Sequence, residues 1–373
     1  MITIRSVEVR GFRNLAAQSI ELHPRFNVLF GDNGQGKTST LEAVYLATTS
    51  RSFRTVTLGE CIAHDQRIAK VRVFVTDPRE PGAPAREQRV DIDGTVGRGR
   101  RSVKLHGKRP ATLAEFALAT PIVLFEPATL GLSQGGATER RKLLDRVAVH
   151  LAAARGGAAA LLRDYERYRR AHQHRKRALE RGLDARAVEP FEQLMGEHGA
   201  AIVRARMEAA ACLAPRTTVA FTRIAQTPLS LEVAYAPRAP GDAAEFVRAL
   251  AESRADDARR GRTRVGPHLD ELTLTLDGRP AREVASQGQH RALVLALKGA
   301  ELATIADARG VQPILLLDDV SSELDPLRND AFFALLREQM GQVLLTTTRP
   351  ELLDSLPERA DLAVHGGVVR RVH

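Results

Sequence analysis

The residues best suited to chemistry form one glycine-rich segment near the start of the chain. It has a glycine, four further residues and then Gly-Lys-Thr, which is the Walker A spacing. Glycines let the backbone curl so that successive N–H groups point at phosphate oxygens. The lysine can reach the β- and γ-phosphates, and the threonine hydroxyl can ligate Mg²⁺. The segment therefore predicts a site for ATP and Mg²⁺. Its expected nucleotide-binding residues are Gly31, Asp32, Asn33, Gly34, Gln35, Gly36, Lys37 and Thr38.

Two adjacent acids follow an apolar run late in the chain. Ile314–Leu317 is typical of a buried strand, and Asp318 and Asp319 come directly after it. In P-loop ATPases an aspartate at a strand end helps to hold Mg²⁺, and a neighbouring acid can polarise the attacking water. We expect Asp318 to join Thr38 as a metal ligand, and Asp319 to be the base that acts with Lys37 in catalysis. A strand end capped by turn-forming aspartates is the alternative interpretation.

A third segment resembles the Ser-Gly-Gly-Gln signature of ABC-type ATPases, although a glutamine replaces one glycine. Its residues are Ser286, Gln287, Gly288 and Gln289. An expected helix, Arg291–Ala303, follows it, and a serine hydroxyl, a glycine backbone and a helix N-terminus together favour an anion. A serine in this place is also a common N-cap, which is the alternative interpretation. Ser322–Asp325 then fits the D-loop pattern, and Asp325 is expected near the nucleotide.

The order glycine loop, signature, acidic strand and D-loop is typical of the ABC ATPase superfamily. In that arrangement the nucleotide lies between two heads, and the signature of one subunit faces the glycine loop of the other in a two-fold symmetric homodimer. ATP then stabilises the dimer, because its γ-phosphate gains contacts from the second subunit only in that state.

Short apolar strands that alternate with polar turns must position these residues. Phe26–Phe30, before the glycine loop, is typical of a buried strand, and Thr38–Leu46, after it, of a helix. Ile314–Leu317 and Val343–Leu345 are continuous apolar runs, as central parallel strands require. Further strands are expected at Ile4–Arg10, Ile20–Leu22, Val71–Val75, Val90–Ile92 and Ile122–Phe125. The predicted fold class is α/β, an ABC-type P-loop ATPase head with a mixed sheet and helices.

A segment of different character is inserted after Pro127. Thr138–Leu213 is rich in Ala, Arg, Leu and Glu, which favours helix, and Asp242–Arg260 is a further expected helix. Helix breaks are expected at Gly156-Gly157, Gly182 and Pro190. Strands return at Leu272–Leu276, followed by the hairpin-turn pair Asp277-Gly278. We therefore predict the N-terminal part of the head over residues 1–130, an all-helical arm over 131–262, and the C-terminal part of the head over 263–373.

The amino-acid composition narrows the classes of molecule that we expect the chain to bind. The 373 residues carry a net charge of +10, which favours polyanions such as nucleic acid, although arginine-rich composition alone is the alternative explanation. Aromatic residues make up 4% and tryptophan is absent, so a base-stacking platform for single strands is not expected. The two cysteines, Cys61 and Cys212, lie far apart and predict neither a zinc site nor a disulfide framework. Because no apolar run is long enough to span a bilayer and the N-terminus lacks the apolar segment of a signal peptide, we expect a cytoplasmic protein without membrane contact.

Two basic segments are candidates for phosphate contacts, which give salt-dependent affinity without reading sequence. The first is an expected hairpin of the head, with Arg98, Arg100, Arg101, Lys104, Lys108 and Arg109. The second lies on the arm, with Arg163, Arg167, Arg169, Arg170, Arg175, Lys176, Arg177 and Arg181. For the arm, a solvated helical face with i, i+4 ion pairs is the alternative. We favour DNA binding for the hairpin, and the arm can equally serve DNA or protein.

Four motifs together resemble the RecF DNA replication and repair family. They are Val9-Arg10-Gly11-Phe12-Arg13-Asn14-Leu15, the glycine loop, Gly266-Pro267-His268, and the acidic segment from Asp318 to Asp325. Their order and spacing agree from residue 1 to about residue 350. The distance between glycine loop and signature suits an inserted arm and is far too short for the coiled coils of SMC proteins.

The resemblance implies an ATPase head with a helical arm that dimerises on ATP. RecF-like proteins bind duplex DNA near single-strand gaps and work with RecO and RecR to place RecA on gapped DNA, while slow ATP hydrolysis times release. These activities belong to DNA replication, recombination and repair, including the SOS response to DNA damage. In related heads the arginine and the polar residue after the N-terminal aromatic approach the nucleotide, and Arg13 and Asn14 occupy those places. A solvated turn after the first strand is the alternative for this pair.

The chain departs from the family and superfamily patterns at three places. Leu269 stands where family members usually carry an arginine after Gly-Pro-His, so any DNA or partner contact of that arginine is lost or moved. Thr346-Thr347-Thr348 occupies the place of the switch histidine of transporters, as in RecF-like chains generally, which suits weaker γ-phosphate sensing. No Q-loop glutamine is identified, and Glu126 is its stand-in.

Two rival functions remain. The first is the ATP-binding subunit of a transporter, against which stand the long insertion and the missing switch histidine. The second is an ATPase-nuclease of the overcoming-lysogenisation type, for whose acidic nuclease domain the chain after Asp325 is expected to be too short.

Overall fold

The computed structural model describes residues 1–95, 99–319, 334, 338, 341–353 and 356–372. The chain packs into two compact units, one made of residues 1–129 and 305–373 and the other of residues 130–304. Two sets of expected site residues, Arg98 and the D-loop segment Ser322–Asp325, lie outside the described residues.

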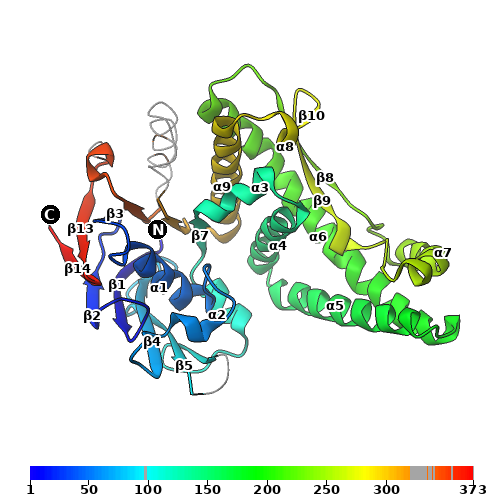
Figure 1. Cartoon of the computed structure of the whole chain (residues 1–373), viewed down its shortest axis with the longest axis horizontal. Helices are drawn as coiled ribbons and strands as arrows, with labels where there is room; N and C mark the ends of the chain where they lie inside the picture. The colour runs from blue at the N-terminus through cyan, green and yellow to red at the C-terminus, as the bar shows by residue number, and fades with distance from the viewer. Residues whose placement is uncertain (96–98, 320–333, 335–337, 339–340, 354–355, 373) are drawn as a thin grey trace. The chain divides into compact units, whose positions relative to one another are not determined.

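The first unit contains a six-stranded sheet in the order β14-β13-β3-β12-β11-β7 (Figure 1). Its strands are β3 (Phe26–Phe30), β7 (Ile122–Phe125), β11 (Ile314–Leu317), β12 (Val343–Thr347), β13 (Arg359–His365) and β14 (Val368–Arg371). All neighbours pair in parallel except β13 and β14. Every residue of β11 and β12 is buried, as expected for strands covered on both faces. The strands predicted around the glycine loop and before the two acids are therefore confirmed.

A five-stranded antiparallel sheet, in the order β2-β1-β4-β5-β6, completes the first unit. Its strands are β1 (Thr3–Arg10), β2 (Gln18–Glu21), β4 (Ile68–Thr76), β5 (Arg86–Asp93) and β6 (Arg100–Leu105). The four strands expected here are confirmed, and β5 and β6 form the hairpin predicted for the basic segment.

One hydrophobic core joins the two sheets of this unit. Helix α1 (Lys37–Thr49) contacts strands of both, and its Leu41 and Leu46 are fully buried with Phe12 of the loop after β1. The shorter elements are η1 (Leu58–Cys61), α2 (Leu113–Ala119), η2 (Pro127–Leu130) and η5 (Pro350–Leu353). Because α1 directly follows the glycine loop, this core fixes the helix on which any phosphate site depends.

Four long helices dominate the second unit. They are α4 (Ala137–Ala154), α5 (Ala158–Glu180), α6 (Ala185–Ala225) and α7 (Ala243–Arg260). The helices α5 and α6 run side by side in Figure 1, and α7 packs on α6. Tyr168, Met195, Ile202 and Phe246 are buried between these three helices.

Two of the three expected helix breaks are confirmed, at Gly156-Gly157 and at Gly182. The prediction of a break at Pro190 is wrong, because this residue lies inside α6, as does Pro215. Proline removes one backbone donor and costs about 3 kcal/mol inside a helix. Burial of a long apolar face, including Met195 and Ile202, offsets that cost.

The second unit also contains a three-stranded antiparallel sheet, which corrects the prediction of an all-helical arm. The strands are β8 (Leu231–Ala236), β9 (Glu271–Leu276) and β10 (Arg279–Pro280), in the order β10-β9-β8. The β8 strand lies within residues 131–262 and pairs along its whole length with β9. The turn at Asp277-Gly278 is confirmed, since both residues have positive φ as a type I′ hairpin turn requires.

Packing divides the chain differently from the second expected boundary. The unit of residues 130–304 extends beyond 262 because β9 pairs with β8, and it includes η3 (Pro267–Leu269), α3 (Gly131–Gln134) and α8 (Ala281–Val284). The unit boundary falls within α9 (Gln287–Arg309). The assignment of 1–130, 131–262 and 263–373 to functional domains stays a prediction.

None of the helices in the described part of the chain combines the length and the hydropathy that spanning a bilayer requires.

Candidate nucleotide-binding site

The glycine loop turns the chain from the end of β3 into α1. Gly31 has φ +143°, and a Cβ there would lie 2.4 Å from the backbone oxygen of Val364 in β13. Gly36 has φ +117° and is the N-cap of α1. Both conformations are open to glycine and strained for other residues. The two glycines therefore let the loop pass β13 and aim its backbone at the start of the helix.

Lys37 is the first residue of α1 and folds back over the loop. Its Nζ donates to the carbonyl oxygens of Gly31 at 2.6 Å and Asp32 at 2.9 Å. Burial lowers the pKa of Lys37, against the raising influence of Asp319 and the other nearby acids. This side chain thus holds the loop curled and can exchange its carbonyl partners for phosphate oxygens.

Three oxygen-bearing side chains meet where three parallel strands end. The β12 strand lies between β3 and β11, so the residues that follow or end these strands come together. Asp318 Oδ1 accepts hydrogen bonds from Thr38 Oγ1 at 2.8 Å and from Thr346 Oγ1 at 2.9 Å. A carboxylate beside a hydroxyl is the donor set that Mg²⁺ prefers, so the residues present fit this ion. The sequence analysis predicts that Thr38 and Asp318 act together, but it does not predict the contact of Thr346 with Asp318. The only indication in the sequence is that Thr346 occupies the place of the switch histidine.

The two acids are held in different ways. Burial raises the pKa of Asp318, and the nearby charge of Asp319 acts in the same direction, while the hydrogen bonds of the two threonines oppose them. Asp319 has φ +53° and donates its backbone N–H to Thr346 Oγ1 at 2.9 Å. A non-glycine residue in this region is uncommon and is held there by its surroundings. Thr346 therefore contacts both acids and sets their relative position.

A hollow of about 460 Å³ opens over the glycine loop in the first unit. Five of the eight expected glycine-loop residues line it, among them Lys37 and Thr38, and so does Asp319. Its other lining residues are Arg13, Asn14, Asn33, Gly34, Gly36, Ser39, Arg54, Ile62 and Thr346. Gln35 is directed elsewhere, since its side-chain oxygen accepts from the N–H of Gly366 at 2.7 Å.

Arg13 and Asn14 reach the hollow in different ways. Arg13 makes a two-pronged ion pair with Glu42 of α1, at 2.9 and 2.6 Å. Burial opposes the charge of Arg13, but Glu42 outweighs it and raises the pKa of the guanidinium. Asn14 donates to the carbonyl of Gly34 at 2.9 Å and accepts from Ser39 at 2.8 Å. Asn14 thus ties the glycine loop to α1, and the pair is more than a solvated turn.

The signature segment lies at the start of α9, in the second unit. Ser286 Oγ accepts the backbone N–H of Gln289 at 3.3 Å, and the Gln289 side chain accepts the N–H of Ser286 at 2.7 Å. This reciprocal pair is a capping box, the N-cap role named as the alternative. Capping leaves the exposed N-terminus of the helix available to an anion, so both roles are compatible.

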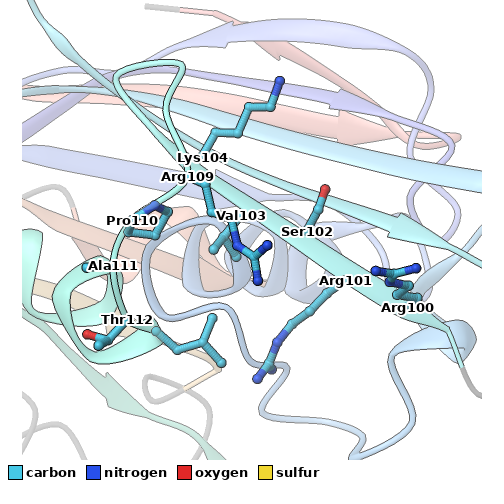
Figure 2. A pocket seen from close by; sticks show the side chains of 10 residues that line it. Arg100, Arg101, Ser102, Val103, Lys104, Arg109, Pro110, Ala111 and Thr112 are labelled. Atoms are coloured by element: carbon cyan, nitrogen blue, oxygen red, sulfur yellow. The ribbon is translucent and has the colours of Figure 1, made fainter.

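The basic strand β6 presents its side chains in two directions. Arg100 and Lys104 are exposed, whereas Arg101 is half-buried and donates to the carbonyl of Ser50 at 2.7 Å. Burial lowers the pKa of Arg101, and the charge of Arg51 adds to this effect. In Figure 2 the side chains of Lys104 and Arg109 extend in different directions. Arg100, Arg101, Lys104 and Arg109 all line one hollow of about 460 Å³, so the structure brings four of the expected residues together.

The arm cluster does not form one basic face. Arg175 is fully buried and binds Glu192 and Asp257, so its assignment to a phosphate-binding surface is corrected. Arg170 pairs with Glu166, and Lys176 with Glu180, both at i, i+4 spacing. These pairs agree with the solvated-face alternative.

Two further expected residues have defined surroundings. Leu269 is 40% exposed after Pro267-His268, and the His268 ring lies 2.8 Å from Tyr168 Oη within the second unit. Glu126 follows β7, and its backbone N–H donates to Thr129 Oγ1 at 3.0 Å. A Q-loop role for Glu126 stays a prediction.

Comparison with known proteins places these features in a family. A family model described as the RecF/RecN/SMC N terminal domain matches residues 3–367. The DNA replication and repair protein RecF of Anaeromyxobacter sp. (strain Fw109-5) is 41% identical over 98% of this chain and 98% of its own. That of Geobacter sulfurreducens is 35% identical over 99% and 100%.

Solved structures of similar fold are found as well. The recombination mediator protein RecF with ATP, described within the RecFOR pathway, superposes with a TM-score of 0.86 at 25% identity, covering 100% of this chain and 98% of that chain. An Smc head bound to the C-winged helix domain of ScpA gives a TM-score of 0.60 at 16% identity, covering 99% of this chain and 96% of that chain, and shows the fold alone. The predicted family and the ABC-type ATPase fold are thereby confirmed, and the transporter alternative is not favoured.

Proposed function

The chain belongs to the RecF family of DNA replication and repair proteins, and on that premise we propose that it is an ATP-dependent recombination mediator. It dimerises on ATP at gapped or junction duplex DNA and, with RecO and RecR, helps to load RecA. Slow ATP hydrolysis times its release. The observation that carries the proposal is the meeting of Thr38, Asp318 and Thr346 beside Lys37, where the parallel strands β3, β12 and β11 end.

In this proposal the phosphates of ATP lie on the glycine loop. The loop N–H groups and the N-terminus of α1 bind them, and Lys37 exchanges the carbonyls of Gly31 and Asp32 for phosphate oxygens. Thr38 and Asp318 hold Mg²⁺, which when bound neutralises phosphate charge. Asp319 orients the attacking water and accepts its proton. Asp319 lies two residues after the end of β11, and the hydrogen bond from its backbone N–H to Thr346 Oγ1 holds it there, which suits that task.

Dimerisation completes the site. Ser286 of the partner subunit approaches the γ-phosphate, and the capping box keeps the N-terminus of its helix ordered. ADP lacks the γ-phosphate and loses this contact, so hydrolysis weakens the dimer. Differential binding of this kind is the only way in which a nucleotide can shift an association equilibrium.

Duplex DNA binds the β6 region through its phosphates. Arg100 and Lys104 supply exposed cations, and together with Arg101 and Arg109 they line one hollow. These contacts carry no base information, which suits recognition of gaps by structure.

The solution mass with and without ATP–Mg²⁺, repeated with gapped duplex DNA, tests the dimer. The wild type is expected to shift from monomer to dimer with ATP and to gain DNA affinity. Lys37→Ala should lose both effects because it loses nucleotide. A constant mass and no DNA response would refute the proposal and leave a P-loop ATPase of another task.

A charge-reversed pair tests the DNA surface. Arg100→Glu with Lys104→Glu should weaken duplex binding and lower the slope of log affinity against log salt, by about one for each lost phosphate contact. Arg370→Glu with Arg371→Glu, at two exposed arginines of β14, is the control pair with the same change in charge and should have less effect. Equal effects of pair and control would remove β6 from the DNA site.

A further inference from the structure

The second unit contains a hollow of about 420 Å³ that takes no part in the nucleotide site. We call it the arm hollow; residues of α5, α6 and the short helix η3 line it. Much of its lining is apolar, with Leu162 and Tyr165 from α5, Ile202 from α6 and Pro267 from η3. A concave site of this size with apolar walls and a few polar groups is typical of a ligand pocket.

The hydroxyls of the two tyrosines in the arm hollow are already used within the fold. Tyr165 Oη donates to Asp145 Oδ1 at 2.6 Å, and Tyr168 Oη lies 2.8 Å from His268 Nδ1. Burial raises the pKa of both tyrosines, so both hydroxyls stay neutral. The two side chains therefore offer a ligand aromatic surface rather than free hydroxyls.

His172 is a polar group of the arm hollow that the fold leaves available. Its ring stacks on Tyr168, with centroids 6.1 Å apart, and lies 4.3 Å from the ring of His268. Among the described residues, none makes a hydrogen bond to its ring nitrogens. Burial lowers the pKa of His172 to about 4, and the charges of His268 and Arg175 act in the same direction. The ring is therefore neutral at neutral pH and offers a ligand one N–H donor and one acceptor.

Arg169 is an exposed cation of the same lining. Its neighbours Arg170 and Lys176 pair with Glu166 and Glu180, whereas Arg169 has no ion pair with any residue of the described part of the chain. The other lining arginine, Arg206, is buried and bound to Asp145 and Asp270. The arm hollow thus presents one positive charge that no acid of the fold balances.

This combination favours an acidic protein segment over nucleic acid or a second copy. Binding along a duplex needs several exposed cations to meet successive phosphates, and Arg169 is the one exposed cation of the described lining. Leu269, directly after His268, is 40% exposed and adds apolar surface beside the arm hollow. The chain has a net charge of +10, so charge complementarity disfavours a second copy and favours an acidic partner.

We propose that the arm hollow is the docking site for an acidic and apolar peptide segment of a partner protein. An aromatic or branched aliphatic side chain of that segment enters between Tyr165, Ile202 and Pro267, as anchor residues of protein interfaces fill pockets. A carboxylate beside it accepts hydrogen bonds from the Arg169 guanidinium and the His172 ring. The walls belong to helices that are already packed, so binding has to order only the peptide. This docking needs no nucleotide and goes beyond the proposed ATP-dependent function.

The test selects random peptides displayed on phage against the full chain, after depletion on the Arg169→Glu variant. The enriched peptides should carry Asp or Glu next to Phe, Leu or Ile. Fluorescence anisotropy of one enriched peptide, labelled with fluorescein, should then show about tenfold weaker binding to Arg169→Glu, because a charge-assisted hydrogen bond is lost. His172→Ala should also weaken binding. Arg167→Glu and His174→Ala change exposed residues of the same helix outside the arm hollow, so these matched controls should bind as wild type.

Three results would overturn the inference. The first is a selection that yields no peptide, and the second is a peptide that binds Arg169→Glu and Arg167→Glu equally well. The third is a fluorescein-labelled DNA duplex that competes with the peptide and loses more affinity in Arg169→Glu than in Arg167→Glu, which would assign the arm hollow to a DNA surface. Lys37→Ala should bind the peptide as wild type, since docking is independent of the ATP site. Thermal unfolding of each variant shows whether a loss of binding reflects a loss of fold.

Discussion

Replacing Arg175 should lower the stability of the second unit rather than selectively weaken DNA binding. Arg175 has no exposed surface and donates to Glu192 at 3.0 Å, Asp257 at 2.7 Å and Thr263 at 3.1 Å. It also donates to the carbonyl of Leu250 at 3.0 Å. Both carboxylates are buried, so Arg175→Met leaves them facing an apolar side chain.

The loss of folding stability in Arg175→Met depends on the hydrogen-bond and ion-pair partners that each carboxylate retains. Glu192 keeps the ion pair with Arg254 at 2.5 Å. Asp257 keeps hydrogen bonds from Ser253 Oγ and the N–H of Arg264, and loses the cation that binds it. Removing one partner of a buried pair costs about 3–5 kcal/mol. A loss of that size lowers the melting temperature by roughly 10 °C for a unit of this length.

Urea unfolding and thermal unfolding of the full chain measure the effect. Arg177→Met, on the exposed side of the same helix, should change stability by no more than about 0.5 kcal/mol. The double variant Arg175→Met with Asp257→Asn should be less damaged than Arg175→Met alone, because the uncompensated charge is gone. Equal stabilities of Arg175→Met and Arg177→Met, or a selective loss of DNA affinity by the folded Arg175 variant, would contradict the buried-pair argument.

Three further predictions concern the nucleotide site, the signature and the thiols. Asp319→Asn should bind ATP but stall hydrolysis, so a solution-mass assay should find the dimer trapped. The fold should survive, since Asn tolerates positive φ. Undiminished phosphate release would count against Asp319 as the base. Ser286→Arg should keep nucleotide binding but block the ATP-dependent dimer, because a bulky cation occupies the γ-phosphate seat; normal dimerisation would show the signature assignment to be wrong. With the pKa of Cys61 raised to about 12 by burial, a thiol reagent at pH 8 should label only Cys212 in the native chain and both cysteines in urea. Because folding disfavours the Cys61 thiolate, stability should fall as pH rises from about 9 to 12, and equal native labelling of both thiols would refute the argument.

The local elements of the site followed from the sequence because their signals are local. A buried strand, a glycine loop and a helix are specified by residues 26–49, and positive φ at Gly31 and Gly36 requires glycine wherever the loop occurs. The same is true of the β5–β6 hairpin and of the turn at Asp277-Gly278. The order of the motifs also allowed the family to be predicted, because a series of motifs along the whole chain fits fewer families than any single motif does.

The errors arose where packing overrides local preference. Arg175 stands among exposed arginines in the sequence, and only the approach of α6 and α7 makes it a buried ion-pair centre. Pro190 is a helix breaker by type, yet the apolar face of α6 carries the helix through it. The β8 strand follows the long helix α6 in a segment predicted to be helical, although its six residues exceed the four of β11; its pairing with β9 makes it a strand.

The sequence by itself determined where a phosphate site is to be expected, since the types and spacing of Lys37 and Thr38 are enough to predict that chemistry. Only the tertiary structure decided which distant groups join them. Strand order brings Asp318 and Thr346 to Thr38, and the fold behind α1 pairs Arg13 with Glu42. The physical reason is that backbone conformation depends on neighbours in the chain, whereas charge balance and hydrogen bonding depend on neighbours in space.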